Sequence, residues 1–210
     1  MPTTTELTEK YLIKHPSIND CLKTDIINYS KLSRKIAKEL KIEKKTSIEA
    51  IQIACRRYQN KIKKAEVFEN KILKILKLSE IEIKNKIIVC IVEKKKLEKI
   101  IDLEKKIHKN SDIIYTIEGS KVYTLITSEK YYNDIKNIFE KTIIKISKDL
   151  AMITLKSPKE LENTPGVNAY VYSRFREKSI NIVEQISCWT DTIIVISDKD
   201  IAIVMDFLKF

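Results

Sequence analysis

The sequence predicts an α+β protein, in which a helical N-terminal module precedes two units that mix strands with helices. In the first 79 residues the apolar side chains recur every three or four positions, which is the period of a helix. From residue 80 onward, runs rich in isoleucine and valine alternate with amphipathic stretches, which indicates strands separated by helices. The 210 residues include only two glycines and four prolines and are 43% hydrophobic, so the chain can bury a substantial core.

The N-terminal module, residues 1–79, is predicted to hold three helices. Pro16 suits the first turn of a helix that runs through Leu22, because that position needs no backbone N–H. Asn28 is a good N-cap for a helix over 29–40. Ser47 caps a longer helix that no glycine or proline interrupts before residue 78, and the pattern leaves open whether it is continuous.

The first mixed unit, residues 80–148, reads as strand, helix, hairpin, helix and strand. Gly119 and Ser120 form the turn of the hairpin. This βαββαβ order is the ferredoxin-like plan. The predicted elements are 81–93, 95–109, 112–129, 131–141 and 142–148.

The second mixed unit, residues 149–210, repeats the pattern as βαββα and lacks a last strand. Its predicted elements are 149–157, 167–179, 180–189, 192–199 and a helix over 200–210 that Asp198 or Asp200 caps. An uncovered strand edge invites unwanted pairing. We therefore expect segment 142–148 or a partner subunit to cover strand 149–157, through close packing of the two units or as a homodimer.

The stretch NTPGVNAYVYSRFREKSINIVEQIS, residues 163–187, resembles the ligand loop of ACT domains, the small regulatory modules of aspartokinases and related enzymes. The resemblance covers 149–210, whereas 80–148 shares only the order of elements and has no Pro-Gly loop. The whole chain resembles archaeal proteins described as predicted regulators of amino acid metabolism with an ACT domain. The residues that carry the resemblance are Asn163, Pro165, Gly166, Val167, Ile180, Asn181 and Ile182.

Gly166 lies where a strand turns into a helix, and its missing Cβ permits an unusual φ and a close approach of the backbone. The N–H groups of the loop and of the new helix would converge on one spot, which suits a carboxylate. The resemblance implies that the loop holds an amino acid through backbone contacts, with side-chain contacts from Asn163 and Asn181. The candidate ligand-binding residues are Asn163, Thr164, Pro165, Gly166, Val167, Asn181 and Ile182. In the alternative reading, Pro-Gly only makes a tight turn.

The positive charge is concentrated in the N-terminal module. Residues 1–79 carry 18 Lys and Arg against 9 Asp and Glu, whereas residues 80–210 carry 22 against 20, within a net charge of +11. Such a module is attracted to polyanions, most often nucleic acid.

A helix-turn-helix reading makes 29–40 the first helix of the pair and the helix from Ser47 the recognition helix. Its candidate nucleic-acid-binding residues are Gln52, Arg56, Arg57, Asn60 and Lys63. Against this reading, the connection 41–46 lacks glycine and exceeds the usual turn. The alternative is a helical packing module with a solvated basic face.

Motifs for catalysis are missing from the sequence: there is no P-loop, no GxGxxG and no nucleophile elbow. The four cysteines and two histidines are scattered, which predicts neither a metal site nor a cofactor. The N-terminus has no secretory signal and no apolar run is long enough to cross a membrane, so we expect a cytoplasmic protein.

These observations predict a non-enzymatic, amino-acid-responsive regulator. Its ACT-like part would bind an amino acid and dimerise, and its basic helices would bind DNA. The alternative is a regulatory subunit that binds a biosynthetic enzyme through protein–protein contacts.

Overall fold

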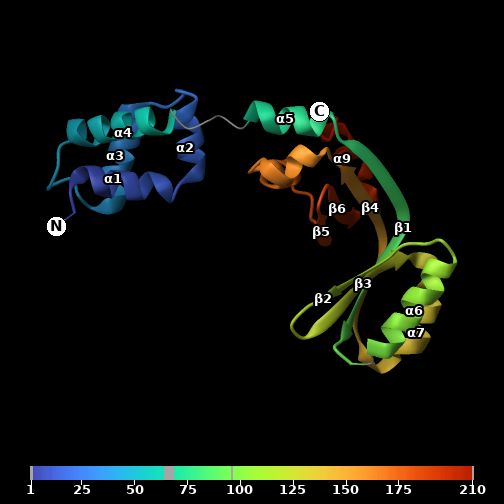
Figure 1. The fold of residues 1–210 in the computed structure, drawn as a ribbon. Helices are drawn as coiled ribbons and strands as arrows, with labels where there is room; N and C mark the ends of the chain where they lie inside the picture. Colours follow the sequence, from blue (N-terminus) through green and yellow to red (C-terminus); the bar gives the residue numbers. More distant parts are fainter. Residues whose placement is uncertain (1, 64–68, 96, 210) are drawn as a thin grey trace. The chain divides into compact units, whose positions relative to one another are not determined.

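The computed structural model describes residues 2–63, 69–95 and 97–209 (Figure 1). The chain divides into two compact units, Met1–Val67 and Phe68–Phe210. Within the described residues, no helix is both long and apolar enough to cross a membrane.

The first unit is a bundle of helices whose ends carry the predicted caps. Asn28 Oδ1 accepts the Lys31 N–H at 3.0 Å, and Ser47 Oγ accepts the Ala50 N–H at 3.1 Å, which confirms both predicted N-caps. A helix that the sequence analysis did not assign opens the chain, with a capping box between Thr3 and Glu6. The described helices are α1 (Thr4–Ile13), α2 (Pro16–Lys23), α3 (Tyr29–Leu40) and α4 (Ile48–Lys63).

The core of this bundle lies along α4, which packs against the other three helices. Ile51 and Cys55 of α4 are fully buried, together with Leu12, Leu22 and Ile36 from the surrounding helices. The question whether α4 continues without a break toward residue 78 falls on residues 64–68, which lie outside the described residues.

The second unit is built on one antiparallel sheet of six described strands in the order β2-β3-β1-β4-β6-β5. The sequence pattern predicts two mixed units, 80–148 and 149–210, whereas the strands of both lie in this one sheet. Its elements are α5 (Glu69–Lys77), β1 (Glu80–Glu93), α6 (Leu97–Lys109), β2 (Ile114–Glu118), β3 (Val122–Ser128), α7 (Tyr132–Phe139), β4 (Ile143–Lys156), α8 (Val167–Glu177), β5 (Glu184–Cys188), β6 (Asp191–Ser197) and α9 (Ile201–Phe207). Short 3-10 turns flank several of them, including Lys159–Asn163 before α8.

The predicted boundary at residues 148/149 does not end a strand. Segments 142–148 and 149–157 form one continuous strand, β4, so the first cannot lie beside the second as expected. Asp149 has a φ of 54° and Lys86, at the corresponding place in β1, has a φ of 55°. Each is a left-handed residue at an irregularity in the β1–β4 register, so each long strand bends there without ending.

Glu80–Lys84, the first part of β1, supplies the strand that the second βαββα pattern lacks. Glu80 pairs with Lys156 and Lys84 with Met152 in an antiparallel ladder. On its other side, β4 pairs with β6 from Leu150 to Lys156. Strand 149–157 is therefore covered within its own chain. The later part of β1 belongs to the first βαββαβ pattern, where it pairs with β3 from Ile87 to Glu93.

The boundary between compact units also differs from the predicted one at residue 79. Helix α5 belongs to the second unit, because Ile72, Ile75 and Leu76 are buried in a core with Val171 and Phe175 of α8. The apolar residues of 69–78 thus fit a helical pattern, as predicted, but they pack on the sheet.

Helices cover one face of the sheet in two groups. Residues of α6 and α7 share a core with β1 and β3, and the two helices lie together in Figure 1. Residues of α5, α8 and α9 share a second core with β4 and β6. A third cluster, which contains Val89, Met152 and Val195, is buried on the opposite face although only strands and their flanking residues contribute to it. The sheet therefore curls over this third cluster.

Two predicted elements of the last repeat are shorter than expected. β5 spans Glu184–Cys188 and not 180–189, because Ile180 turns into the core after the left-handed Ser179, with a φ of 55°. α9 has Asp200 at its N-cap position, and Asp198 opens the 3-10 turn that precedes it.

Candidate functional site

Residues 157–166 connect β4 to α8 and form the loop that we name the ligand loop. Its first residue is fixed by a hydrogen bond from the Ser157 N–H to the Thr190 carbonyl at 2.9 Å. Leu161 anchors the 3-10 turn in the core, and the Thr164 hydroxyl donates to the Glu160 carbonyl at 2.8 Å. The loop is therefore held at several points along its length.

Gly166 ends the ligand loop with a backbone that other residues adopt only with strain. Its φ is 93° and it occupies the N-cap position of α8. A Cβ built there would lie 3.4 Å from Ile72 Cδ1 of α5, which is an ordinary van der Waals distance. The left-handed backbone, and not lack of space, therefore explains the scarce glycine.

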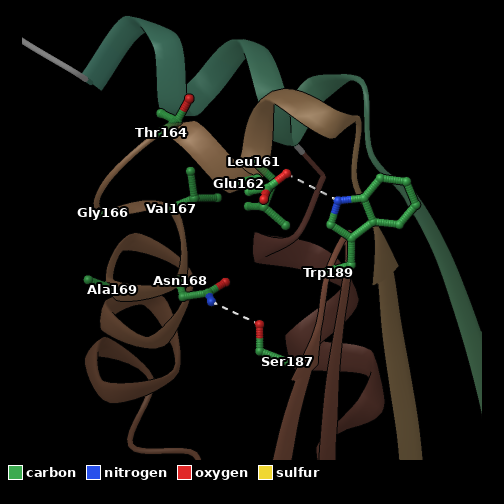
Figure 2. Close-up of a pocket in the computed structure, with 9 residues that line it drawn as sticks. All are labelled: Leu161, Glu162, Thr164, Gly166, Val167, Asn168, Ala169, Ser187 and Trp189. Atoms are coloured by element: carbon green, nitrogen blue, oxygen red, sulfur yellow. Dashed lines mark hydrogen bonds between the residues drawn. The ribbon is translucent and has the colours of Figure 1, made fainter.

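A pocket of about 310 Å³ opens between the ligand loop, the first turn of α8 and the β5–β6 hairpin (Figure 2). It draws on three separate segments of one chain. Its lining residues are Leu161, Glu162, Thr164, Gly166, Val167, Asn168, Ala169, Ser187 and Trp189.

The turn of the β5–β6 hairpin is tied to the ligand loop through Trp189. The indole Nε1 donates to Glu162 Oε2 at 3.3 Å, and Lys159 Nζ lies 5.7 Å from the centre of the ring. Trp189 has a φ of 50°, which turns the hairpin tightly, and 62% of the residue remains exposed. One carboxylate and one indole thus form a wall of the pocket in Figure 2.

Asn168 joins the first turn of α8 to both strands of the hairpin. Its Oδ1 accepts the Thr192 hydroxyl at 3.1 Å, and its Nδ2 donates to Ser187 Oγ at 3.5 Å. Further along α8, the Tyr172 hydroxyl donates to Gln185 of β5, and burial raises the pKa of this phenol. These contacts fix the helix against the hairpin that faces it.

The first turn of α8 presents N–H groups that the described residues do not satisfy. No side chain caps the helix, its first turn has no acidic residue, and the N–H groups of Val167, Asn168 and Ala169 have no acceptor among the described residues. Such donors, together with the helix dipole, favour an anionic group such as a carboxylate. Glu162 lies at the same pocket and offers a carboxylate to a cation.

The structure brings together only some of the predicted ligand-binding residues. Thr164, Gly166 and Val167 line the pocket, whereas the exposed Asn163 and Pro165 lie in the loop without lining it. Asn181 and Ile182 follow the C-terminal end of α8. An 11-residue helix is roughly 16 Å long. Asn181 is therefore at the far end of α8 from Gly166 in the same chain.

Sequence reasoning missed Glu162, Asn168, Ser187 and Trp189. Trp189 had a usable signal, because it is the only tryptophan of the chain and stands at a tight turn between two strands. Glu162 and Asn168 flank the Pro-Gly pair, but only the structure shows that their side chains face the hairpin.

The predicted nucleic-acid-binding residues of α4 are partly engaged by their own unit. Gln52 is half-buried and donates to Ser30 Oγ at 3.1 Å, and the Arg56 guanidinium lies 5.3 Å from the centre of the Tyr29 ring. Arg57 and Asn60 are exposed. The side chain of Lys63 lies outside what the structure describes.

Gln59 of α4 is buried and structural. Its amide donates to the Leu22 carbonyl and to Asp25 Oδ1, each at 2.8 Å, and its Oε1 accepts the Tyr29 hydroxyl at 2.5 Å. It thereby holds the connection between α2 and α3 against α4.

Replacing Gln59 by alanine should lower the free energy of unfolding of the first unit by about 1–3 kcal/mol, because buried polar partners lose their hydrogen bonds. Chemical denaturation followed by circular dichroism measures the change. Asn60→Ala, on the exposed side of the same helix, is the matched control, with an expected change within about 0.5 kcal/mol. Equal effects of the two substitutions would contradict the structural role.

Helix α3 exposes a basic face that the sequence analysis did not single out. Lys31, Arg34 and Lys38 are exposed on α3, Lys41 is exposed at the C-cap of the helix, and no ion pair of the described residues involves these four. Their spacing spans roughly 15 Å along the helix. We name these four residues the α3 basic face.

The comparisons with known proteins show the fold. No protein-family model matches the sequence, and no curated protein matches it. The aspartate kinase of Clostridium acetobutylicum aligns with 61% of this chain and 33% of its own, at a TM-score of 0.52 and 12% identity. A chain from the structure of aspartokinase alpha and beta subunits aligns with 62% of this chain and 95% of its own, at a TM-score of 0.50 and 12% identity. The Synechocystis aspartate kinase aligns with 62% of this chain and 26% of its own, at a TM-score of 0.50 and 14% identity.

The aligned part thus spans a third or less of the two kinases and nearly all of the subunit chain. At these identities the likeness concerns the backbone alone. This chain has an α+β fold with a curled antiparallel sheet, and it shares that fold with part of the aspartate kinases.

Proposed function

We propose that this chain is a regulatory protein without catalytic activity, which binds an amino acid at the ligand loop and DNA through its N-terminal helices. The observation that carries the first part is the uncapped first turn of α8, which opens with Gly166 onto a pocket of about 310 Å³. The shared fold and the ACT-like sequence of the loop support it. The Clostridium kinase that shares the fold is described as an allosteric enzyme.

The two charges of an amino acid suit the two ends of this pocket. The α-carboxylate would accept hydrogen bonds from the N–H groups of Val167, Asn168 and Ala169. The α-ammonium group would lie at Glu162, in place of the side-chain contact expected from Asn163. The ligand side chain would then lie against Trp189.

Asn181 can contribute to such a site from a second copy of the chain. The ACT resemblance implies ligand contacts from strand residues of a partner subunit, and Asn181 is exposed before β5, an edge strand of the sheet. We therefore keep the homodimer as part of the proposal.

Calorimetric titration of the full chain with each of the twenty amino acids tests the ligand. Binding at the pocket should also change the fluorescence of Trp189, which is the only tryptophan and is a pocket residue. A single saturable ligand that shifts this emission is the expected result. Heat without a fluorescence change would place the ligand elsewhere, and no binding by any amino acid would refute the proposal.

Glu162→Gln should weaken amino-acid binding about tenfold or more, because a hydrogen bond to a charged group contributes roughly 1.5–3 kcal/mol. The dissociation constant from the Trp189 titration measures the effect. Glu160→Gln is the matched control, because Glu160 belongs to the same 3-10 turn but does not line the pocket. Equal weakening by both substitutions would count against a direct contact with Glu162.

For DNA, we propose that the α3 basic face meets the phosphates while exposed Arg57 and Asn60 of α4 approach the bases. In helix-turn-helix proteins the first helix of the pair crosses the DNA backbone, which is the place of α3 in this reading. The four cations have no ion-pair partner among the described residues, so they are available to phosphates.

Replacing all four residues of the α3 basic face by glutamine should reduce the slope of log affinity against log salt by about 3 to 4, since each phosphate contact contributes roughly 0.9. Fluorescence anisotropy with a labelled duplex at several salt concentrations measures the slope. Lys10→Gln with Lys14→Gln, which changes exposed charge at the end of α1, is the control. An unchanged slope in the fourfold variant would contradict the assignment, and no binding by the parent chain would refute the DNA proposal.

A second candidate function is a regulatory subunit that binds a biosynthetic enzyme. The comparison with the aspartokinase subunits favours it, because there the shared fold makes up 95% of a separate chain. High salt separates the two candidates, since binding through several phosphates weakens steeply as salt rises, whereas a largely apolar protein interface does not.

A further inference from the structure

Helix α5 contacts the ligand loop near both of the loop's ends. At one end, Ile72 Cδ1 lies 3.4 Å from the position that a Cβ on Gly166 would take. At the other end, Ser79, which follows α5, shares a hydrogen bond of 2.9 Å with the hydroxyl of Ser157. Figure 2 shows the helix passing over the loop.

Between these ends, α5 shares the core on which the ligand loop rests. Ile75 and Leu76 are 4% and 2% exposed and belong to one cluster with Leu161 of the loop and Val167 of α8. The Ser79 hydroxyl also donates to the Ile75 carbonyl at 2.9 Å, which joins the end of the helix to the Ser157 contact. The loop can therefore shift toward α5 only if this packing changes.

Among the residues that the structure describes, helix α5 has no counterpart in the other half of the sheet. The strands of the first pattern are covered by α6 and α7, whereas the second pattern has α8 and α9 and, in addition, α5. The βαββα order does not require this helix. In the sequence, α5 begins six positions after Lys63, the last residue of α4, so it is the element of the second unit that stands next to the helical unit along the chain.

We propose that α5 positions the ligand loop and responds to the occupancy of its pocket, so that it is the element through which the state of the site passes along the chain. The response to a ligand rests on the proposed function, whereas the positioning role can be tested on the free protein. A ligand that engages the N–H groups beside Gly166 acts on a segment that lies next to Ile72 of α5. A shift of this segment on ligand binding changes its packing against Ile72. Because the coupling free energy is reciprocal, a change in the packing of Ile72 alters the free energy of ligand binding by the same amount.

Ile72→Val in the full chain tests the positioning role, because it removes the Cδ1 methyl that faces Gly166. Hydrogen exchange measured by mass spectrometry should become about threefold to tenfold faster at residues 159–169, the range expected for this truncation in a core. Quenching of Trp189 by acrylamide should change as well, because the pocket wall moves with the loop. Hydrogen exchange in β6, which contributes to the same core but is not part of the loop, should stay unchanged.

Leu73→Val is the matched control, since Leu73 is half-buried on the outer side of the same helix. It should leave both readouts as in the parent chain. Equal exchange of 159–169 in the Ile72→Val variant and the parent would overturn the proposal. Faster exchange in β6 as well as in the loop would also overturn it, because it would show general loosening of the core.

A second experiment tests the response to a ligand. It repeats the hydrogen-exchange measurement with each amino acid that changes the fluorescence emission of Trp189. Altered protection of 69–77 on binding supports the proposal. Binding without any change in 69–77 overturns the response of α5 and leaves the proposed amino-acid function intact. If no amino acid binds, the proposed function and the ligand response of α5 fail together, and the Ile72→Val comparison alone decides the positioning role.

Discussion

Removal of residues 1–85 is expected to abolish the fold of the second half of the sheet, although every residue of its βαββα pattern remains. The truncation deletes Glu80–Lys84, the strand that pairs with β4, and α5, which fills the core beside α8. The truncation removes several isoleucines and a leucine from this core together, and the loss of each such side chain costs about 2–5 kcal/mol. Typical domains are stable by only about 5–15 kcal/mol.

The matched chain for this test begins at residue 68 and keeps both α5 and the whole of β1. It should retain protected amides at 150–156 and 191–197 in hydrogen exchange, whereas the shorter chain should lose them. Persistence of these protected amides in the chain that begins at residue 86 would show that the βαββα segment folds without the strand Glu80–Lys84.

Gly166→Asp is expected to weaken amino-acid binding by about tenfold to a hundredfold. Aspartate would place a carboxylate beside the N–H groups of the first turn of α8 that the ligand carboxylate needs. Its negative charge would also repel that carboxylate. Calorimetric titration with the amino acid found for the parent chain measures the loss.

Gly166→Ala separates the strain from the charge. A residue with a Cβ at a φ of 93° is strained by roughly 1–2 kcal/mol, which should lower the melting temperature of both variants. Only the aspartate variant should lose most of its binding. Parent-like affinity in Gly166→Asp would refute the ligand loop as the binding site.

The sequence predicted the elements well where a local signal sets their ends. The caps at Asn28 and Ser47 and the proline at the start of α2 act within one turn, so their effect can be read from neighbouring residues. The pattern failed at Asp149, where the alternation breaks although the strand continues. A left-handed residue within a strand and a turn between two strands look alike in a sequence, and only pairing with β1 distinguishes them.

In the candidate site too, the sequence predicted the residues with a local signal and missed those that meet only in the folded chain. Gly166 could be found because its backbone requirement is local and glycine is scarce in this chain. Glu162 and Trp189 meet across 27 positions of sequence, and that approach depends on how the hairpin folds back over the loop. Asn181 looked close to the site in the resemblance, whereas the length of α8 separates it from Gly166 within one chain.

The pairing of Glu80–Lys84 with β4 also sets an order of events during synthesis. Glu80–Lys84 leaves the ribosome about 70 residues before its partners Met152–Lys156, and β6 follows only at 191–197. The first βαββαβ pattern can close as soon as residue 149 has emerged, while the earlier strand still waits with an unpaired edge. Until residue 156 has emerged, the nascent chain therefore carries an unpaired strand beside the first pattern, and β4 gains its second neighbour only when β6 follows.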